Sequence, residues 1–144
     1  MMHKKNNKKK VLFICPHNSA RSQMAEGLLK TLFGDYYNVH SAGTAPSSIN
    51  PNAIQVMKEI GIDISSYRSK NVSEFMDVQF DYVITVCDYA KESCPFFPGE
   101  IIIHKGFKDP AQADGSQEDI LREFRKSRDE IKSWLTRTFK PKKD

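Results

Sequence analysis

Apolar residues in this chain form short continuous runs rather than alternating with polar residues. The first run, VLFIC at residues 11–15, is followed by similar runs at 81–87 and 100–104 and by a weaker one at 39–42. A strand that is apolar at every position is typical of a parallel sheet covered on both faces. The pattern therefore predicts four strands, and the first of them ends at Cys15.

Between these runs, apolar residues recur every three or four positions, as in helices with one buried face. Such segments occur at 22–33 before Gly34, from Asn50 and Pro51 to Gly61, and at 118–139. The alternation of strands and helices predicts an α/β fold, a three-layer sandwich with a four-stranded parallel sheet flanked by helices and joined by right-handed crossovers. Ligands of such folds bind beyond the carboxyl ends of the strands.

The formal charge of +4 comes from the ends of the chain. Eight of the 22 lysines and arginines lie within residues 1–10 and 140–144, and the rest of the chain holds 14 basic and 17 acidic residues. No aromatic residue is interleaved with the terminal lysines, so we expect no nucleic-acid partner. We expect a disordered basic tail at 1–10, one catalytic domain at 11–139 and a C-terminal tail at 140–144.

The three cysteines are odd in number and widely spaced, and we expect no signal peptide, because the first apolar run, at residues 11–15, is too short for one. This usage is typical of a cytoplasmic protein with reduced thiols. No apolar stretch approaches the roughly 20 residues that span a bilayer, so we expect no membrane association. A zinc site is excluded because no two cysteines stand two to four residues apart and His17 and His104 form no close pair. We predict no metal and no cofactor, and we expect a monomer.

The turn after the first strand carries the strongest chemical signal. Cys15 is followed by five residues, then Arg21 and Ser22, where a helix begins. A loop at a helix N-terminus can point its N–H groups at a tetrahedral oxyanion, and an arginine can bind two of the oxygens. Positive surroundings favour the thiolate, so Cys15 is expected to be a nucleophile. The predicted oxyanion-binding residues are Pro16, His17, Asn18, Ser19, Ala20, Arg21 and Ser22.

Two further features support chemistry at the same edge of the sheet. Cys87 ends a predicted strand, and Cys94 follows seven residues later at the other end of a polar segment that could bring the two thiols together. A buried core cysteine is the alternative for Cys87. Asp109, before Pro110, is a candidate proton donor, although an Asp-Pro pair by itself more often marks a turn.

From Val11 to about Phe139, these residues resemble the low-molecular-weight protein tyrosine phosphatase fold, in particular its thioredoxin-coupled arsenate reductases. The resemblance implies that Asn18 braces the loop, that Ser22 hydrogen-bonds the Cys15 thiolate and that Asp109 is the general acid. Phosphatases of this fold typically place two tyrosines after that Asp-Pro, whereas Ala111 and Gln112 follow here.

The resemblance also implies a relay of three thiols. Arsenate, for which phosphate or sulfate are analogues, reacts with Cys15, and Cys87 then attacks Cys15 to release arsenite. Cys94 attacks Cys87, and the resulting Cys87–Cys94 disulfide is reduced by thioredoxin. Some of these reductases hold a monovalent cation beside the loop with a downstream acidic residue, but Arg68, Ser69 and Lys70 stand there in this chain, so no such cation is predicted.

Two alternatives remain open from the sequence. A low-molecular-weight phosphatase would share the loop and Asp109 but would need only Cys15 among the thiols. A non-catalytic oxyanion or redox sensor would use the disulfide to change shape and bind a partner. Turnover distinguishes the sensor, because a sensor would be oxidised once without consuming reductant continuously.

Overall fold

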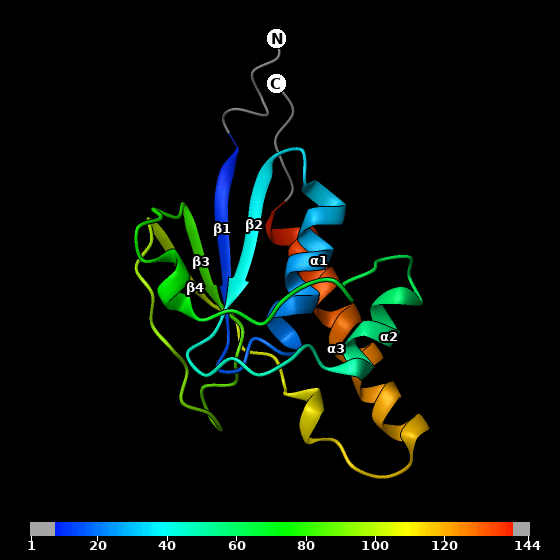
Figure 1. The fold of residues 1–144 in the computed structure, drawn as a ribbon. Helices are drawn as coiled ribbons and strands as arrows, with labels where there is room; N and C mark the ends of the chain where they lie inside the picture. Colours follow the sequence, from blue (N-terminus) through cyan, green and yellow to red (C-terminus); the bar gives the residue numbers. More distant parts are fainter. Residues whose placement is uncertain (1–7, 140–144) are drawn as a thin grey trace.

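The fold is a four-stranded parallel sheet with three helices packed on one face (Figure 1). The computed structural model describes residues 8–139. The strands are β1 (Lys9–Ile14), β2 (Tyr37–Ala42), β3 (Tyr82–Thr85) and β4 (Ile101–His104), in the spatial order β2-β1-β3-β4. The helices are α1 (Arg21–Phe33), α2 (Pro51–Lys58) and α3 (Gln117–Thr138), with short 3₁₀ helices η2 (Val72–Phe75) and η3 (Pro110–Gln112).

Strand β1 lies at the centre of the sheet, and its side chains alternate between two apolar cores. Val11 and Phe13 belong to the core shared with the three helices, whereas Leu12 and Ile14 belong to a smaller core on the opposite face. That second face is covered by η2 and the adjacent irregular segments, including Phe80 and Phe97. Burial on both faces explains the continuous apolar run of this strand. The predicted fold class is confirmed, with a thin third layer.

Several boundaries differ from the predictions. Strand β1 begins at Lys9, so Lys9 and Lys10, which we expected in a disordered tail, pair with Tyr37 and Asn38 of β2. Lys8, also in that predicted tail, precedes the strand, and residues 1–7 and the predicted C-terminal tail at 140–144 lie outside the described residues. Strand β3 ends at Thr85, so Cys87 lies two residues beyond the strand rather than at its last position.

All four strands run in the same direction, so their carboxyl ends meet at one edge of the sheet. The loop from β1 to α1, the segment after β3 and the segment after β4 therefore converge there, as Figure 1 shows below the strands. Within residues 8–139, no helix is long and apolar enough to cross a membrane.

Candidate active site

The loop between β1 and α1 encloses a pocket of about 130 Å³. The nucleophile candidate Cys15 is buried at 3% exposure and remains a free thiol. A cavity of this size suits a tetrahedral oxyanion rather than a large organic ligand, because ordinary small-molecule pockets have several hundred Å³. The residues that line it are Cys15, His17, Ser19, Ala20, Arg21, Ser47, Asp109, Ala111 and Gln112.

The carbonyl groups of the loop are bonded outward to neighbouring segments. Pro16 O accepts from Ala45 N, and Ser19 O accepts from Asn50 N. His17 O and Asn18 O both accept from the hydroxyl of Ser69. Within residues 8–139, by contrast, the backbone N–H groups of residues 17–22 donate to no acceptor. Six donors are thus left for an anion, as a loop at a helix N-terminus can provide.

Asn18 maintains the shape of this loop. Its φ of 48° lies in the left-handed region, which asparagine tolerates better than most residues. Its amide group donates to the hydroxyls of Ser22 (2.8 Å) and Ser41 (2.9 Å). Its carbonyl oxygen accepts from Gln23 Nε2 (2.9 Å) and from the backbone of Lys70 (2.9 Å). Every hydrogen-bonding position of this buried side chain is therefore used.

A chain of polar groups leads from the thiol into the protein. The Cys15 Sγ and Ser22 Oγ atoms are 2.9 Å apart, and Asn18 connects Ser22 to Ser41. Ser41 donates to Glu26, a carboxylate at 5% exposure. The contacts expected of Asn18 and Ser22 are both present, whereas Ser41 and Glu26 were not predicted as part of the site.

Positive charge lies around the Glu26 carboxylate. Its Oε2 is 2.7 Å from Lys30 Nζ, and its Oε1 is 3.9 Å from Lys70 Nζ. Burial lowers the pKa of Lys70, and the charge of Glu26 opposes that shift. The ammonium of Lys70 thus lies near Glu26, while its backbone N–H contacts Asn18 of the loop. No group of three or more potential metal-ligating side chains occurs in the described part of the chain.

The Arg21 side chain reaches three acceptors at the mouth of the pocket. Its NH1 and NH2 atoms donate to the two carboxylate oxygens of Glu92, at 2.5 and 2.7 Å, and NH1 also donates to Phe107 O. Asp109 Oδ2 lies 3.6 Å from NH2. The pKa of Glu92 is lowered, chiefly by its hydrogen bonds from Arg21. No local sequence pattern marks Glu92, because its partner lies 71 positions away.

Asp109 precedes the one-turn helix η3 and caps it. Its Oδ1 accepts from the backbone of Ala111 at 3.0 Å, which leaves Oδ2 toward Arg21. The turn expected of an Asp-Pro pair and a carboxylate at the pocket are thus both present. Asp109 is half-buried, so its carboxyl group is open to the pocket that it lines.

Cys87 and Cys94 are joined in a disulfide. Cys87 is fully buried and Cys94 is partly buried. The turn between them is held by hydrogen bonds from the backbone N–H groups of Lys91 and Glu92 to Asp88 O. The segment continues to the pocket, because Asp88, Glu92 and Ser93 line a wider depression together with His17 and Asp109. All five predicted reactive residues therefore lie at the same edge of the sheet.

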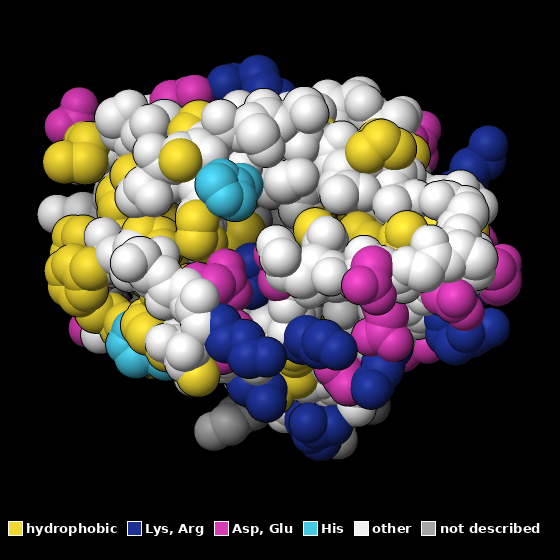
Figure 2. All heavy atoms as spheres, turned by 90° about the horizontal axis from the view of Figure 1, so that it is seen from below, with side chains coloured by type: hydrophobic (Ala, Val, Ile, Leu, Met, Phe, Trp, Pro, Cys, Tyr) yellow, Lys and Arg dark blue, Asp and Glu magenta, His cyan; other side chains and the backbone are white. Residues whose placement is uncertain are grey.

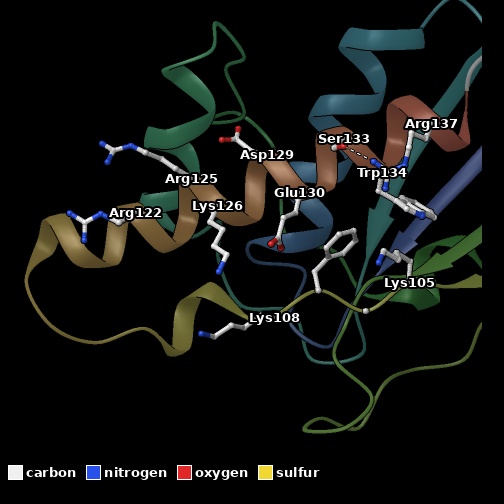
Figure 3. A pocket seen from close by; sticks show the side chains of 12 residues that line it. Lys105, Lys108, Arg122, Arg125, Lys126, Asp129, Glu130, Ser133, Trp134 and Arg137 are labelled. Atoms are coloured by element: carbon white, nitrogen blue, oxygen red, sulfur yellow. Dashed lines mark hydrogen bonds between the residues drawn. The ribbon is translucent and has the colours of Figure 1, made fainter.

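A larger groove, of about 780 Å³, lies beside α3, and no cysteine lines it. Figure 3 shows Lys105 and Lys108, on the segment after β4, facing Lys126, Trp134 and other side chains of α3. Figure 2, which looks onto the carboxyl ends of the strands, shows hydrophobic side chains gathered on one side of this face and charged ones on the other. The smaller pocket is the better candidate for the active site, because it contains the thiol, the arginine and the free N–H groups.

Comparison with known proteins gives one consistent result. The family model described as low molecular weight phosphotyrosine protein phosphatase matches residues 10–142. An arsenate reductase of Halalkalibacterium halodurans is 46% identical over 126 residues, which cover 87% of this chain and 91% of the relative.

Two solved structures extend this comparison. A structure described as an arsenate reductase in the phosphate binding state has a TM-score of 0.76 and 36% identity, and the match covers 90% of this chain and 95% of that one. A thioredoxin-dependent arsenate reductase of Corynebacterium glutamicum has a TM-score of 0.64 and 29% identity over 93% of this chain and 64% of its own.

Proposed function

Because the chain belongs to the low molecular weight phosphotyrosine protein phosphatase family, we propose that it is a thioredoxin-dependent arsenate reductase, which converts arsenate to arsenite. The observation that carries this proposal is the Cys87–Cys94 disulfide, in the segment whose Glu92 contacts Arg21. A phosphatase needs only the loop thiol, whereas a reductase must also remove two oxidising equivalents. The arsenate reductases among the relatives support the same activity.

Arsenate binds first in the pocket of the loop. The free N–H groups of residues 17–22 donate to its oxygens, and the guanidinium of Arg21 binds two of them. The positive end of α1 adds to this attraction, because Ala20 makes no side-chain cap and leaves the first turn open. Phosphate and sulfate have the same tetrahedral shape and bind as unreactive analogues.

Cys15 then attacks arsenic as a thiolate, and one oxygen leaves as water after Asp109 protonates it. The hydroxyl of Ser22, 2.9 Å from the sulfur, stabilises the thiolate by donating a hydrogen bond. The product of this step is a covalent bond between the Cys15 sulfur and arsenic(V).

Reduction follows when the thiolate of Cys87 attacks the sulfur of Cys15. The sulfur–arsenic bond breaks, its electron pair passes to arsenic, and arsenite leaves as a Cys15–Cys87 disulfide forms. Cys94 next attacks the sulfur of Cys87 and expels Cys15 as a thiolate. The resulting Cys87–Cys94 disulfide, the bond present in the structure, is reduced by the dithiol of thioredoxin.

The disulfide is transferred away from Cys15 because thioredoxin cannot reach that cysteine. Cys15 is buried at the base of a pocket of about 130 Å³, which a protein reductant cannot enter. Cys94 is more exposed than Cys15 and Cys87. The relay thus moves the disulfide toward the surface. We place the protein in the cytoplasm, as a monomer, where thioredoxin keeps such disulfides reduced.

A single-turnover experiment tests this function directly. Fully reduced protein mixed with arsenate and no thioredoxin is expected to release about one arsenite per chain, because each chain stores one pair of electrons for each disulfide formed. Cys94→Ser is expected to release the same amount, whereas Cys15→Ser and Cys87→Ser release none. Arsenite release by Cys15→Ser, or none by the wild type, would contradict the proposal.

A further inference from the structure

The carboxylate of Glu92 is hydrogen-bonded to the guanidinium of Arg21, the side chain that the proposed mechanism needs for binding the substrate. Both of its oxygens accept hydrogen bonds from the terminal nitrogens of Arg21, in the two-pronged geometry that an arginine also offers to arsenate or phosphate. NH1 is fully used, because its second hydrogen is donated to Phe107 O at 3.1 Å. An oxyanion can therefore bind the NH1–NH2 edge of Arg21 only if Glu92 leaves, and while Glu92 stays it can use only the Nε–H and the second NH2 hydrogen.

Charge strengthens this competition. Arg21 is 4% exposed and Glu92 is 19% exposed, so water screens their interaction only in part. Asp109 lies 3.6 Å from the same guanidinium. A doubly charged oxyanion entering the pocket would meet two carboxylates and an arginine whose charge is already neutralised. Binding in this state is unfavourable because like charges repel more strongly where water is scarce.

The disulfide holds Glu92 in this position. The bond between Cys87 and Cys94 closes a ring of eight residues that contains Glu92, with the two Cα atoms 6.0 Å apart. Inside the ring, the backbone N–H of Glu92 donates to Asp88 O, and the Glu92 carboxylate accepts from the backbone of Asp88. Cys87 is fully buried and anchors one end. The ring thus has little freedom to withdraw the carboxylate from Arg21.

We propose that Glu92 is an internal ligand of the oxyanion site, which occupies Arg21 in the disulfide form and is released when the Cys87–Cys94 bond is reduced. Reduction adds two electrons and two protons, so the disulfide becomes two thiols and the dithiol reductant becomes a disulfide. The opened segment is free to move, and Arg21 becomes available. Glu92 acts through Arg21 and is therefore a positioning residue. This inference rests on the proposed function for its place in the cycle.

The consequence is an ordered cycle. The oxidised enzyme, whose Cys87 and Cys94 thiols are already consumed in the disulfide, binds a new arsenate weakly, and the reduced enzyme binds it more tightly. By thermodynamic linkage, an oxyanion that binds the reduced form more tightly must also favour reduction of the disulfide by the same factor. Substrate present in the cell would then help regenerate its own enzyme.

Phosphate binding tests the inference without any turnover. Calorimetric titration of the oxidised protein and of the protein reduced by dithiothreitol, both kept anaerobic, is expected to show at least about tenfold tighter binding to the reduced form. Glu92→Gln keeps an acceptor for the backbone of Asp88 but removes the charge, so its oxidised form is expected to bind phosphate nearly as tightly as its reduced form. Glu100→Gln removes one exposed charge outside the ring and is expected to keep the wild-type ratio.

The reduction potential of the disulfide provides a second readout that a merely structural role would not change. Phosphate is expected to raise the potential of the wild type by about 30 mV for a tenfold coupling, and to leave that of Glu92→Gln nearly unchanged. Equal phosphate affinity of the two wild-type forms, or a wild-type ratio in Glu92→Gln, would overturn the inference. Arsenate turnover with equal affinities would refute the inference alone, whereas redox-dependent phosphate binding without turnover would refute the proposed function alone.

Discussion

Asn18 is the residue on which the shape of the anion loop depends most. Its backbone is in the left-handed region, and its side chain is bonded to Ser22, Ser41, Gln23 and the backbone of Lys70. Removal of the side chain leaves several buried groups without a partner, each of which costs about 1–3 kcal/mol when it finds no water. The backbone conformation adds a separate cost for any residue with a Cβ atom.

Two substitutions separate these contributions. Asn18→Gly loses the side-chain hydrogen bonds but adopts the positive φ without strain. Asn18→Ala loses the same hydrogen bonds and also strains the backbone at that φ. We expect Asn18→Ala to be less stable than Asn18→Gly by about 1 kcal/mol, and both to be less stable than the wild type, as measured by urea unfolding. Equal stability of the two variants would show that the loop relaxes out of the left-handed conformation.

At the scale of elements, the end of β2 sets how closely the loop packs. Gly43 follows β2, and a Cβ atom there would stand 2.5 Å from both Cys15 O and Pro16 O. These are backbone atoms at the base of the pocket, so they cannot rotate away as a side chain would. A glycine is therefore required at this position for the loop to keep its geometry.

Gly43→Ala is expected to lower kcat/KM for arsenate at least about tenfold, because small displacements of binding groups are costly in catalysis. Gly27→Ala is the matched control, since its added Cβ meets only side-chain atoms, with Ile64 the nearest at 2.9 Å. That variant is expected to lose stability while kcat/KM stays near the wild-type value. A wild-type kcat/KM for Gly43→Ala would contradict the account of the loop.

Element boundaries show what an apolar pattern can and cannot predict. The run at residues 11–15 located β1 because both faces of this strand are buried. Lys9 and Lys10 extend the strand through backbone pairing with β2. Because their side chains are charged, the apolar pattern could not include them. Val86 and Cys87 are buried but lie beyond β3, so burial alone overestimated that strand.

At the scale of the whole molecule, ion pairs join helices that are distant in sequence. Glu59, at the end of α2, accepts hydrogen bonds from Arg125 and Arg128 of α3 at 2.9–3.1 Å. The hydrogen bonds from Arg125, followed by those from Arg128, lower the pKa of Glu59 below its ordinary value of 4.5. The folded state thus stabilises the ionised carboxylate of Glu59 more than the unfolded chain does.

The sign of the pH effect follows from that shift. A carboxyl group with a lowered pKa in the folded state stabilises the protein fully above its ordinary pKa, and this stabilisation is lost as the pH falls through the folded value. Glu59→Gln is therefore expected to lower the stability at pH 7 and to have less effect near pH 3, in urea unfolding at each pH. Glu130→Gln, on the exposed side of α3, is the control. An equal effect of Glu59→Gln at both values would contradict the role of the ion pair.

The same long-range contacts limit what the sequence could predict about the site. Cys15, Arg21 and Ser22 were identifiable because they lie within eight residues, between a recognisable strand and a recognisable helix. Ser41 and Glu92 join the site across 23 and 71 positions, from Asn18 and Arg21 respectively, and no local pattern marks them. Only the three-dimensional packing of β2 and of the segment after β3 against the loop brings these side chains to the site.

The most direct test of the whole account is continuous consumption of NADPH by the purified protein with thioredoxin, thioredoxin reductase and arsenate. We expect sustained consumption by the wild type and almost none by Cys94→Ser. That variant releases about one arsenite per chain with electrons from its own thiols and then stops at the Cys15–Cys87 disulfide, which thioredoxin does not reduce. Hydrolysis of para-nitrophenyl phosphate, measured in parallel, reports any phosphatase activity of Cys15. Sustained turnover by Cys94→Ser would contradict the relay, and no NADPH consumption with rapid ester hydrolysis would identify the protein as a phosphatase instead.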